Sequence, residues 1–248
     1  MIEKPILMQP TSEGYDKEWA DVSGVIKKRI PHFFPEIIFD VGANIGDIAL
    51  KFVSTYPSAV VYAFEPVPGP YQALYDLCLQ NNKIMSFPVA LSHLDGIVKM
   101  NVPPDSKLSR VVKPGTELAS SIQVTALTGD RFCSENGVQS IDYLKIDTEG
   151  HDMEVLKGFL NFLERQAVGM IEVEAGILDG SESHIDLNAF QRFLKRFGYH
   201  LFYMFEQTSD IYFSGRPILR RVNALFISSR LCEQNTRQRK YSRRWERS

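Results

Sequence analysis

Residues 37–46, which read IIFDVGANIG, constrain the fold of this chain more than any other stretch. The apolar run before Asp40 is typical of a strand that is buried on both faces, and Gly42 and Gly46 permit a tight backbone turn. After Gly46 the apolar residues recur with helical spacing. The stretch therefore predicts a strand, a glycine turn and a helix in succession, with a small polar ligand at the turn.

Strands and helices alternate along most of the chain, as judged from the period of the apolar residues. Further strands are predicted at 60–66, 84–92, 141–147 and 168–174, and helices at 45–53, 71–79, 152–164 and 187–197. Two more strands, at 200–207 and 221–228, follow each other without a helix between them. This order predicts an α/β fold with a doubly wound, mostly parallel sheet whose last strand is antiparallel.

We divide the chain into three parts. Residues 1–35 are predicted to form an N-terminal helical cap, with a helix over 16–30 that ends before Pro31. Residues 36–229 form the main domain, and its insertion at about 95–124 is predicted to contain loops and short strands that can cover a ligand. Residues 230–248 form a basic tail, with seven Lys or Arg against two Glu. We expect this tail to be solvated and partly frayed, and contact with an acidic partner or a membrane surface is the alternative.

The composition argues against a nucleic-acid-binding protein, a disulfide-rich protein and a membrane-spanning protein. The net charge of −2 gives no indication of specific nucleic-acid binding. The three cysteines lack a CxxC spacing, which favours neither a zinc site nor a disulfide framework and fits a reducing, cytoplasmic setting. No apolar stretch has the length of a signal peptide or a membrane span. The sequence is compatible with a homodimer but does not indicate the oligomeric state.

Acidic side chains follow the predicted strands at three places, near Asp40, Glu65 and Asp147. Ligands of open α/β sheets bind beyond these carboxyl ends. Glu65 comes 23 residues after Gly42, where a carboxylate can accept hydrogen bonds from both hydroxyls of a ribose. The position suits NAD as well as S-adenosylmethionine, but the turn lacks the GxGxxG spacing of pyrophosphate loops, which favours the second. The alternative is a glycine turn with a purely structural role.

Four segments in this order, DVGANIG, FEP, VALS and LKIDTEGHDMEVLKG, resemble the FkbM family of S-adenosylmethionine-dependent methyltransferases. The resemblance extends over roughly 37–174, and KIDTEGHD is its most specific part. It implies a class I methyltransferase (Rossmann-like) fold, in which the antiparallel last strand lies inside the sheet. It also implies transfer of a methyl group, typically to an oxygen of a sugar, glycan or secondary metabolite.

The resemblance also assigns roles to residues. The methionine portion of the cofactor would contact Asp40, Gly42, Asn44 and Gly46, the ribose Glu65, and the adenine Ala90, Leu91 and Ser92. The methyl group and the acceptor would face Asp147, Glu149 and His151. Two positions depart from the wider class: Asn44 stands where a third glycine is common, and no acidic residue directly follows the third strand.

A hydroxyl acceptor has to lose a proton during methyl transfer. His151 is the first candidate for the general base, because imidazole titrates near neutral pH, and Asp147 or Glu149 would orient the acceptor. A structural role for His151 at a helix start is the alternative. Glu174 is expected beside the acceptor pocket, at the end of its strand.

A divalent metal is the competing mechanism. Its candidate ligands are Asp147, Glu149, Glu174, His151 and Glu172. His93 and His184 fall in predicted loops and receive no role.

Two basic residues of the insertion, Lys107 and Arg110, are candidates for contact with an anionic acceptor, and solvated loop charges are the alternative. For the chain as a whole, an NAD-dependent oxidoreductase and a noncatalytic nucleotide-binding or scaffold domain are the alternatives to a methyltransferase. The partner expected from the sequence is a small-molecule or glycan acceptor.

Overall fold

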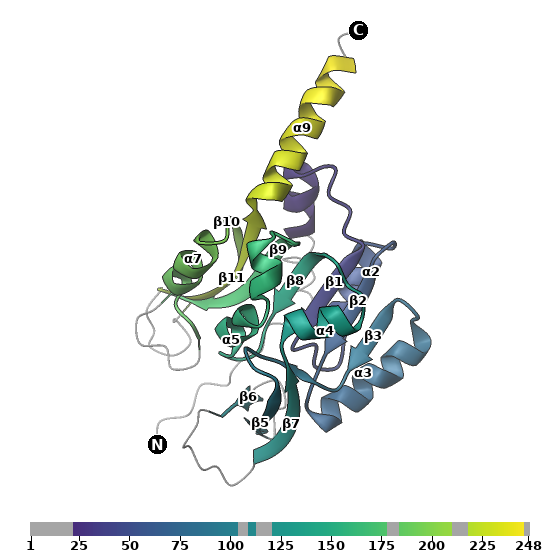
Figure 1. The fold of residues 1–248 in the computed structure, drawn as a ribbon, viewed down its shortest axis with the longest axis vertical. Coiled ribbons are helices and arrows are strands. Elements are labelled where there is room, and N and C mark those ends of the chain that lie inside the picture. Colours follow the sequence, from purple (N-terminus) through teal and green to yellow (C-terminus); the bar gives the residue numbers. More distant parts are fainter. Residues whose placement is uncertain (1–21, 104–108, 113–120, 178–183, 210–217, 246–248) are drawn as a thin grey trace, which may run out of the picture.

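The computed structural model describes residues 22–103, 109–112, 121–177, 184–209 and 218–245, with side chains as far as 238. Its main sheet has the strand order β10-β11-β9-β8-β1-β2-β3 (Figure 1). The strands span Ile37–Val41 (β1), Val60–Phe64 (β2), Ile84–Phe87 (β3), Ile141–Ile146 (β8), Val168–Gly176 (β9), Tyr199–Ser209 (β10) and Leu219–Ser228 (β11).

The direction of the strands confirms the predicted fold class. β1 pairs in parallel with both β2 and β8, β2 with β3, and β8 with β9. The last strand, β11, is antiparallel to both of its neighbours, β9 and β10, and lies between them. The carboxyl ends of β1, β2, β8 and β9 therefore meet at one edge of the sheet, where ligands of such folds bind.

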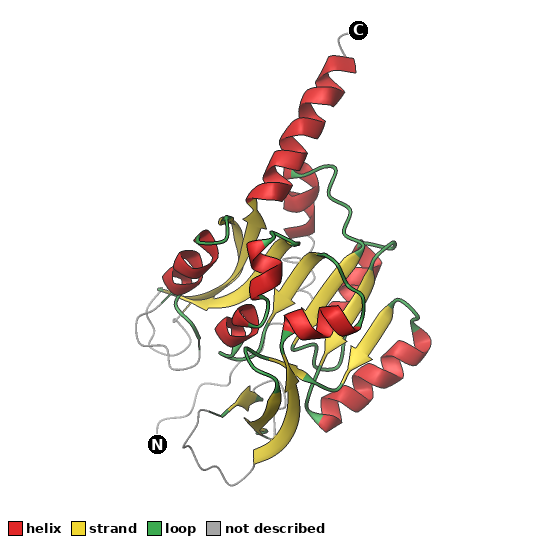
Figure 2. Cartoon of the chain, in the orientation of Figure 1, coloured by secondary structure: helices red, strands yellow, loops and turns green. Residues whose placement is uncertain are grey.

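Helices cover both faces of the main sheet (Figure 2). Their bounds are Asp47–Thr55 (α2), Pro68–Gln80 (α3), Gly129–Glu135 (α4), Asp152–Lys157 (α5), Leu160–Glu164 (α6), Leu187–Lys195 (α7) and Ser229–Trp245 (α9). Side chains of α4, α5, α6 and α7 are buried with Phe39 and Val41 on one face. Side chains of α2, α3 and the helical residues 22–29 are buried with Ile38 on the other face. Neighbouring residues of β1 thus enter opposite cores, as the two-residue period of a strand requires.

The single helix predicted over 152–164 is wrong, because the chain breaks into α5 and α6. The break follows from contacts that are distant in sequence. A side chain at Gly158 would place its Cβ 2.1 Å from the carbonyl oxygen of Ser92, so the chain passes close to that backbone. The carboxylate of Asp130 then accepts hydrogen bonds from the backbone N–H groups of Asn161 and Phe162 and caps α6.

A second, smaller sheet has the order β4-β7-β5-β6 and contains the described part of the predicted insertion. Its strands are Ala90–Leu91 (β4), Gly96–Asn101 (β5), Arg110–Val111 (β6) and Ser121–Leu127 (β7). The strand predicted at 84–92 divides at Pro88 into β3 in the main sheet and β4 in the small one. The small sheet has its own apolar cluster, which includes Val67 after β2. Lys107 lies outside the described residues.

The tail expected to be solvated and partly frayed over 230–248 is helical from Ser229 to Trp245, and residues 246–248 lie outside the described residues. This helix, α9, extends away from the body of the molecule (Figure 1). Its first turn packs on the core through Leu231 and Cys232. The side chain of Asn235 donates a hydrogen bond of 3.1 Å to the carbonyl of Arg29, which joins α9 to the N-terminal helix. Periodicity did not reveal this helix because most of its residues are polar.

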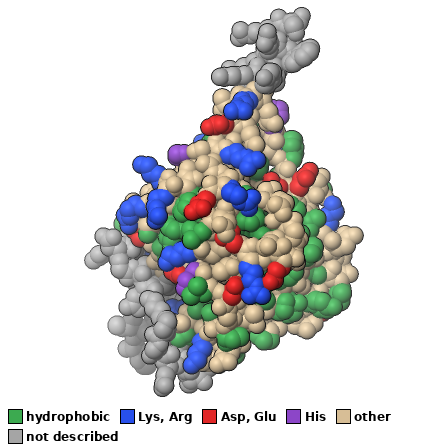
Figure 3. Space-filling model, viewed as in Figure 1, with side chains coloured by type: hydrophobic (Ala, Val, Ile, Leu, Met, Phe, Trp, Pro, Cys, Tyr) green, Lys and Arg blue, Asp and Glu red, His purple; other side chains and the backbone are tan. Residues whose placement is uncertain are grey.

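Acidic and basic side chains are interspersed over the face that Figure 3 shows, in keeping with the small net charge. Among the described residues, no helix combines the length and the apolar character that crossing a membrane requires.

Candidate active site

The turn after β1 fits tightly against the end of β8. Gly42, Asn44 and Gly46 all have positive φ, at 85°, 49° and 93°. A Cβ on Gly42 would lie 1.9 Å from the backbone oxygen of Asp147, so a larger residue cannot occupy this position without moving one strand end. The turn predicted from the sequence therefore has a physical reason: it brings the loop after β1 into contact with the loop after β8.

Glu65 is fixed at the end of β2 and is almost fully buried, with 7% of its surface exposed. One carboxylate oxygen accepts the backbone N–H of Asn44 at 2.9 Å, and the other accepts that of Val67 at 2.8 Å. Burial raises the pKa of Glu65, and these two hydrogen bonds oppose the increase. Because each carboxylate oxygen can accept more than one hydrogen bond, Glu65 can still receive hydroxyl donors.

A row of buried charges crosses three neighbouring strands. Asp40 on β1 is in register with Lys145 on β8, which is in register with Glu172 on β9. The Lys145 ammonium lies 3.4 Å from Asp40 Oδ1 and 3.3 Å from Asp147 Oδ2. Burial raises the pKa of Asp40, and Lys145 opposes this. Neither carboxylate oxygen of Asp40 has a hydrogen-bond partner among the described residues.

Glu172 faces the interior of the protein. The hydroxyl of Tyr143 donates a hydrogen bond of 2.5 Å to its carboxylate, and the amide of Asn223 donates another at 3.2 Å. Burial raises the pKa of Glu172 to about 7, although the charge of Lys145 lowers it. This residue therefore belongs to the buried row and is not grouped with the other proposed metal ligands.

His151 connects the start of α5 to the small sheet. Its Nε2 lies 2.9 Å from the hydroxyl of Ser92, which directly follows β4 and is itself buried. Burial lowers the pKa of His151, so the imidazole is neutral near pH 7. On the exposed side, His93 Nδ1 lies 2.9 Å from Glu154. The structure thus places His151 next to the segment expected near the adenine.

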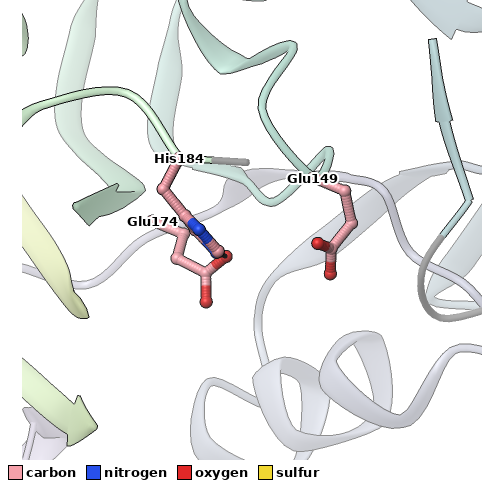
Figure 4. Close-up of side chains that lie close together, drawn as sticks. All are labelled: Glu149, Glu174 and His184. Atoms are coloured by element: carbon pink, nitrogen blue, oxygen red, sulfur yellow. Dashed lines mark ion pairs between the residues drawn. The ribbon is translucent and has the colours of Figure 1, made fainter. Parts of the chain in front are cut away.

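Glu149 and Glu174 are brought together with a residue that the sequence analysis left without a role, His184 (Figure 4). One atom from each of the three side chains could bind a metal ion, and these atoms lie within 4.8 Å of one another. His184 Nε2 lies 2.7 Å from one Glu174 oxygen, and Arg221 pairs with the other. Asp147 and His151, which were also considered as metal ligands, are not part of this group.

The pKa values in this cluster depend on burial and on neighbouring charges. Burial, followed by the charges of Asp147 and Glu174, raises the pKa of Glu149 to about 7. The hydrogen bond to Glu174 raises the pKa of His184. The sequence carries no signal for His184, because it lies in a loop ten residues after Glu174 and loops lack a period.

The remaining candidates are spread more widely. Ala90 and Leu91 are buried in β4, and Arg110 is exposed on β6.

The known sequences that this chain resembles are methyltransferases, and a family model matches it as well. The family model described as "Methyltransferase FkbM domain" matches residues 40–201. Hexuronic acid methyltransferase AglP of Haloferax volcanii is 30% identical over 146 residues, which cover 57% of each chain. The 2-O-methyltransferase NoeI of Sinorhizobium fredii is 28% identical and is matched over 49% of this chain and 56% of its own.

A further relative, 31-O-demethyl-FK506 methyltransferase FkbM of Streptomyces tacrolimicus, is 26% identical over 50% of this chain and 59% of its own. The matches thus span little more than half the length of these curated relatives.

Solved structures show the same fold at low sequence identity. A methyltransferase FkbM from Methylobacillus flagellatus aligns with a TM-score of 0.51 and 15% identity, over 77% of this chain and 43% of that one. Magnesium protoporphyrin IX methyltransferase from Synechocystis, solved with bound S-adenosylmethionine, aligns with a TM-score of 0.50 and 11% identity, over 88% and 81% of the chains. The FkbM family model matches residues 40–201, which are more than half of this chain. The chain therefore belongs to the FkbM methyltransferase family.

Proposed function

We propose that this protein transfers a methyl group from S-adenosylmethionine to a hydroxyl of a sugar, glycan or related secondary metabolite. The observation that carries the proposal is the pair of buried carboxylates, Asp40 and Glu65, at the ends of adjacent parallel strands of an FkbM-family chain. The oxygen acceptor is supported by relatives whose names specify 2-O and 31-O methylation.

The chain's residues fit the methionine portion of the cofactor. Asp40 is fully buried, and Lys145 lies 3.4 Å from its Oδ1, while its Oδ2 has no hydrogen-bond partner among the described residues and could accept one from the cofactor's ammonium group. Gly42, Asn44 and Gly46 shape the turn beside it, and their backbone would surround the amino-acid tail. We therefore assign the methionine portion to the loop after β1.

The nucleoside portion fits the neighbouring strand ends. Glu65 would accept the ribose hydroxyls, since its carboxylate is held in place by two backbone N–H groups. Ala90, Leu91 and Ser92 would line the adenine, and Asp147 would lie between the cofactor and the acceptor.

When bound, S-adenosylmethionine supplies an electrophilic methyl group on a sulfonium. The protein then has to orient the hydroxyl in line with that group and remove its proton. His151 is the proposed base, because its imidazole is neutral near pH 7. Its Nε2 is engaged by the Ser92 hydroxyl, so Nδ1 would have to take the proton. Asp147, Glu149 and Glu174 are proposed to orient the acceptor, and Lys107 and Arg110 to attract an anionic one such as a hexuronic acid.

Calorimetry on the Glu65→Gln variant tests the cofactor assignment. We expect the affinity for S-adenosylhomocysteine to fall by about 1–3 kcal/mol, the scale of a lost hydrogen bond to a charged group. Glu164→Gln, an exposed Glu at the end of α6, is the matched control and should bind as the wild type does. Unchanged affinity in Glu65→Gln would place the ribose elsewhere, and binding of NADH instead would favour the oxidoreductase.

Turnover separates an enzyme from a binding domain. The wild type is incubated with S-adenosylmethionine and methyl glucosiduronic acid, glucose or fucose glycosides, and released S-adenosylhomocysteine is measured. We expect release that depends on the glycoside. Cofactor binding without release on any of these probes would support a noncatalytic domain.

A further inference from the structure

Three separate segments bring Glu149, Glu174 and His184 together. Glu149 follows β8, Glu174 lies near the end of β9, and His184 precedes α7. His184 Nε2 lies 2.7 Å from a Glu174 oxygen, and Figure 4 shows the carboxyl groups of Glu149 and Glu174 pointing to the same side. The possible ligand atoms lie within 4.8 Å of one another, so small side-chain movements would bring them to bonds of about 2.0–2.2 Å with a single ion.

The surroundings orient these side chains. Arg221 holds one oxygen of Glu174, which leaves the other directed at His184 Nε2. A metal-binding carboxylate is commonly held in this way by a hydrogen bond to its second oxygen. The Glu174 and His184 side chains are only 13% and 9% exposed, so water competes little for their ligand atoms.

A buried carboxyl that interacts with this cluster lacks one hydrogen-bond partner. Asp152 is 2% exposed, and its Oδ1 has no hydrogen-bond partner among the described residues. Its carboxyl interacts electrostatically with those of Asp147 and Glu174, and both raise its pKa. Four carboxyl groups thus interact beside β8 and β9. Lys145 pairs with Asp147 and Arg221 with Glu174, and a bound cation would further offset the repulsion among the four.

We propose that Glu149, Glu174 and His184 form a binding site for a divalent transition-metal ion such as Mn²⁺ or Zn²⁺. The imidazole distinguishes this set from the all-oxygen sites that Mg²⁺ and Ca²⁺ prefer. Because the site adjoins Asp147, the ion would polarise the acceptor hydroxyl and ease the loss of its proton. This role, unlike the binding site itself, rests on the proposed function.

Metal binding is measured on the full chain after treatment with EDTA, by calorimetry with Zn²⁺ and by electron paramagnetic resonance with Mn²⁺. We expect one site, and a loss of affinity of at least about 10- to 100-fold in His184→Ala and in Glu149→Gln. The matched control removes another His and Glu pair, His93 and Glu154, whose atoms lie 2.9 Å apart outside the cluster. The variants His93→Ala and Glu154→Gln should bind the metal as the wild type does.

The outcomes separate the site from the proposed function. The site is overturned if the wild type binds neither Zn²⁺ nor Mn²⁺. It is also overturned if His184→Ala, with a native thermal unfolding profile, binds the metal as the wild type does. In that case His184 and Glu174 form a hydrogen-bonded pair that does not bind a metal ion. Failure to bind S-adenosylmethionine contradicts the proposed function instead, while the metal titration still decides the site. Methyl transfer at an unchanged rate after metal removal would overturn the catalytic role of the ion.

Discussion

The two faces of the main sheet are built on different principles. One face is packed with aromatic rings: the ring centroid of Phe132 lies 4.7 Å from that of Phe64 and 4.8 Å from that of Phe87. The other face carries the row Asp40, Lys145 and Glu172 among its apolar residues. The first face is stabilised by burial and shape, while the second depends on a balance of charge that is in place before any ligand arrives.

This difference shows how the fold and the site share one sheet. Buried ion pairs are weak contributors to stability, because the desolvation of the charges offsets much of their attraction. The charged face nevertheless places Asp40 and Asp147 on either side of Lys145, at the strand ends where the cofactor is proposed to bind. The aromatic face can therefore be varied for stability, whereas the charged face cannot be varied without affecting the site.

The largest expected effect is that of Lys145→Met, which removes the cation from the row. Asp40 and Glu172 would then be buried without their partner, so the free energy of unfolding should fall by about 3–5 kcal/mol near pH 8. The loss should be smaller near pH 5, because burial raises the pKa of both carboxyls, that of Glu172 to about 7, so Glu172 binds a proton there. Urea unfolding at both pH values measures this, and an equal loss at both would contradict the charge balance.

Asp152 is a buried carboxyl on the helices of the aromatic side, and none of the causes of its pKa shift is a cation. Burial, followed by the charge of Asp147, raises its pKa from 3.8 to about 7. The folded state therefore binds more protons than the unfolded state between these values, and stability falls as the pH rises through that window.

Asp152→Asn should remove this dependence and make the protein more stable than the wild type by about 2 kcal/mol near pH 8. Thermal and urea unfolding of the EDTA-treated protein across pH 4 to 8 provide the measurement. A variant that is less stable than the wild type at high pH would mean that Asp152 has a cationic partner.

The smallest expected effect is that of Phe132→Leu on the aromatic face. The substitution keeps an apolar side chain but loses ring contacts, so we expect a loss of about 1.5 kcal/mol. No charge changes, and the loss should be the same near pH 5 and pH 8. If it varied with pH, the two faces would be coupled.

The sequence predicts the parts of the fold that local patterns determine. Apolar runs predict β1, β2, β8 and β9, and the missing helix between the last two strands predicts the antiparallel β11. The break at Gly158 could not be predicted, because it depends on the carbonyl of Ser92, 66 residues away in the chain. The role of His184 also depends on tertiary contact, since only folding brings it beside Glu174.

Gly42 has a consequence that reaches beyond its own turn. No methyl group fits between Gly42 and the Asp147 carbonyl, so the segments after β1 and β8 are in direct backbone contact and form one shared wall. A movement of either segment toward the other therefore requires the other segment to move as well. Descendants of this chain can therefore adopt a new acceptor most readily by altering outlying loops, and must leave that shared wall untouched.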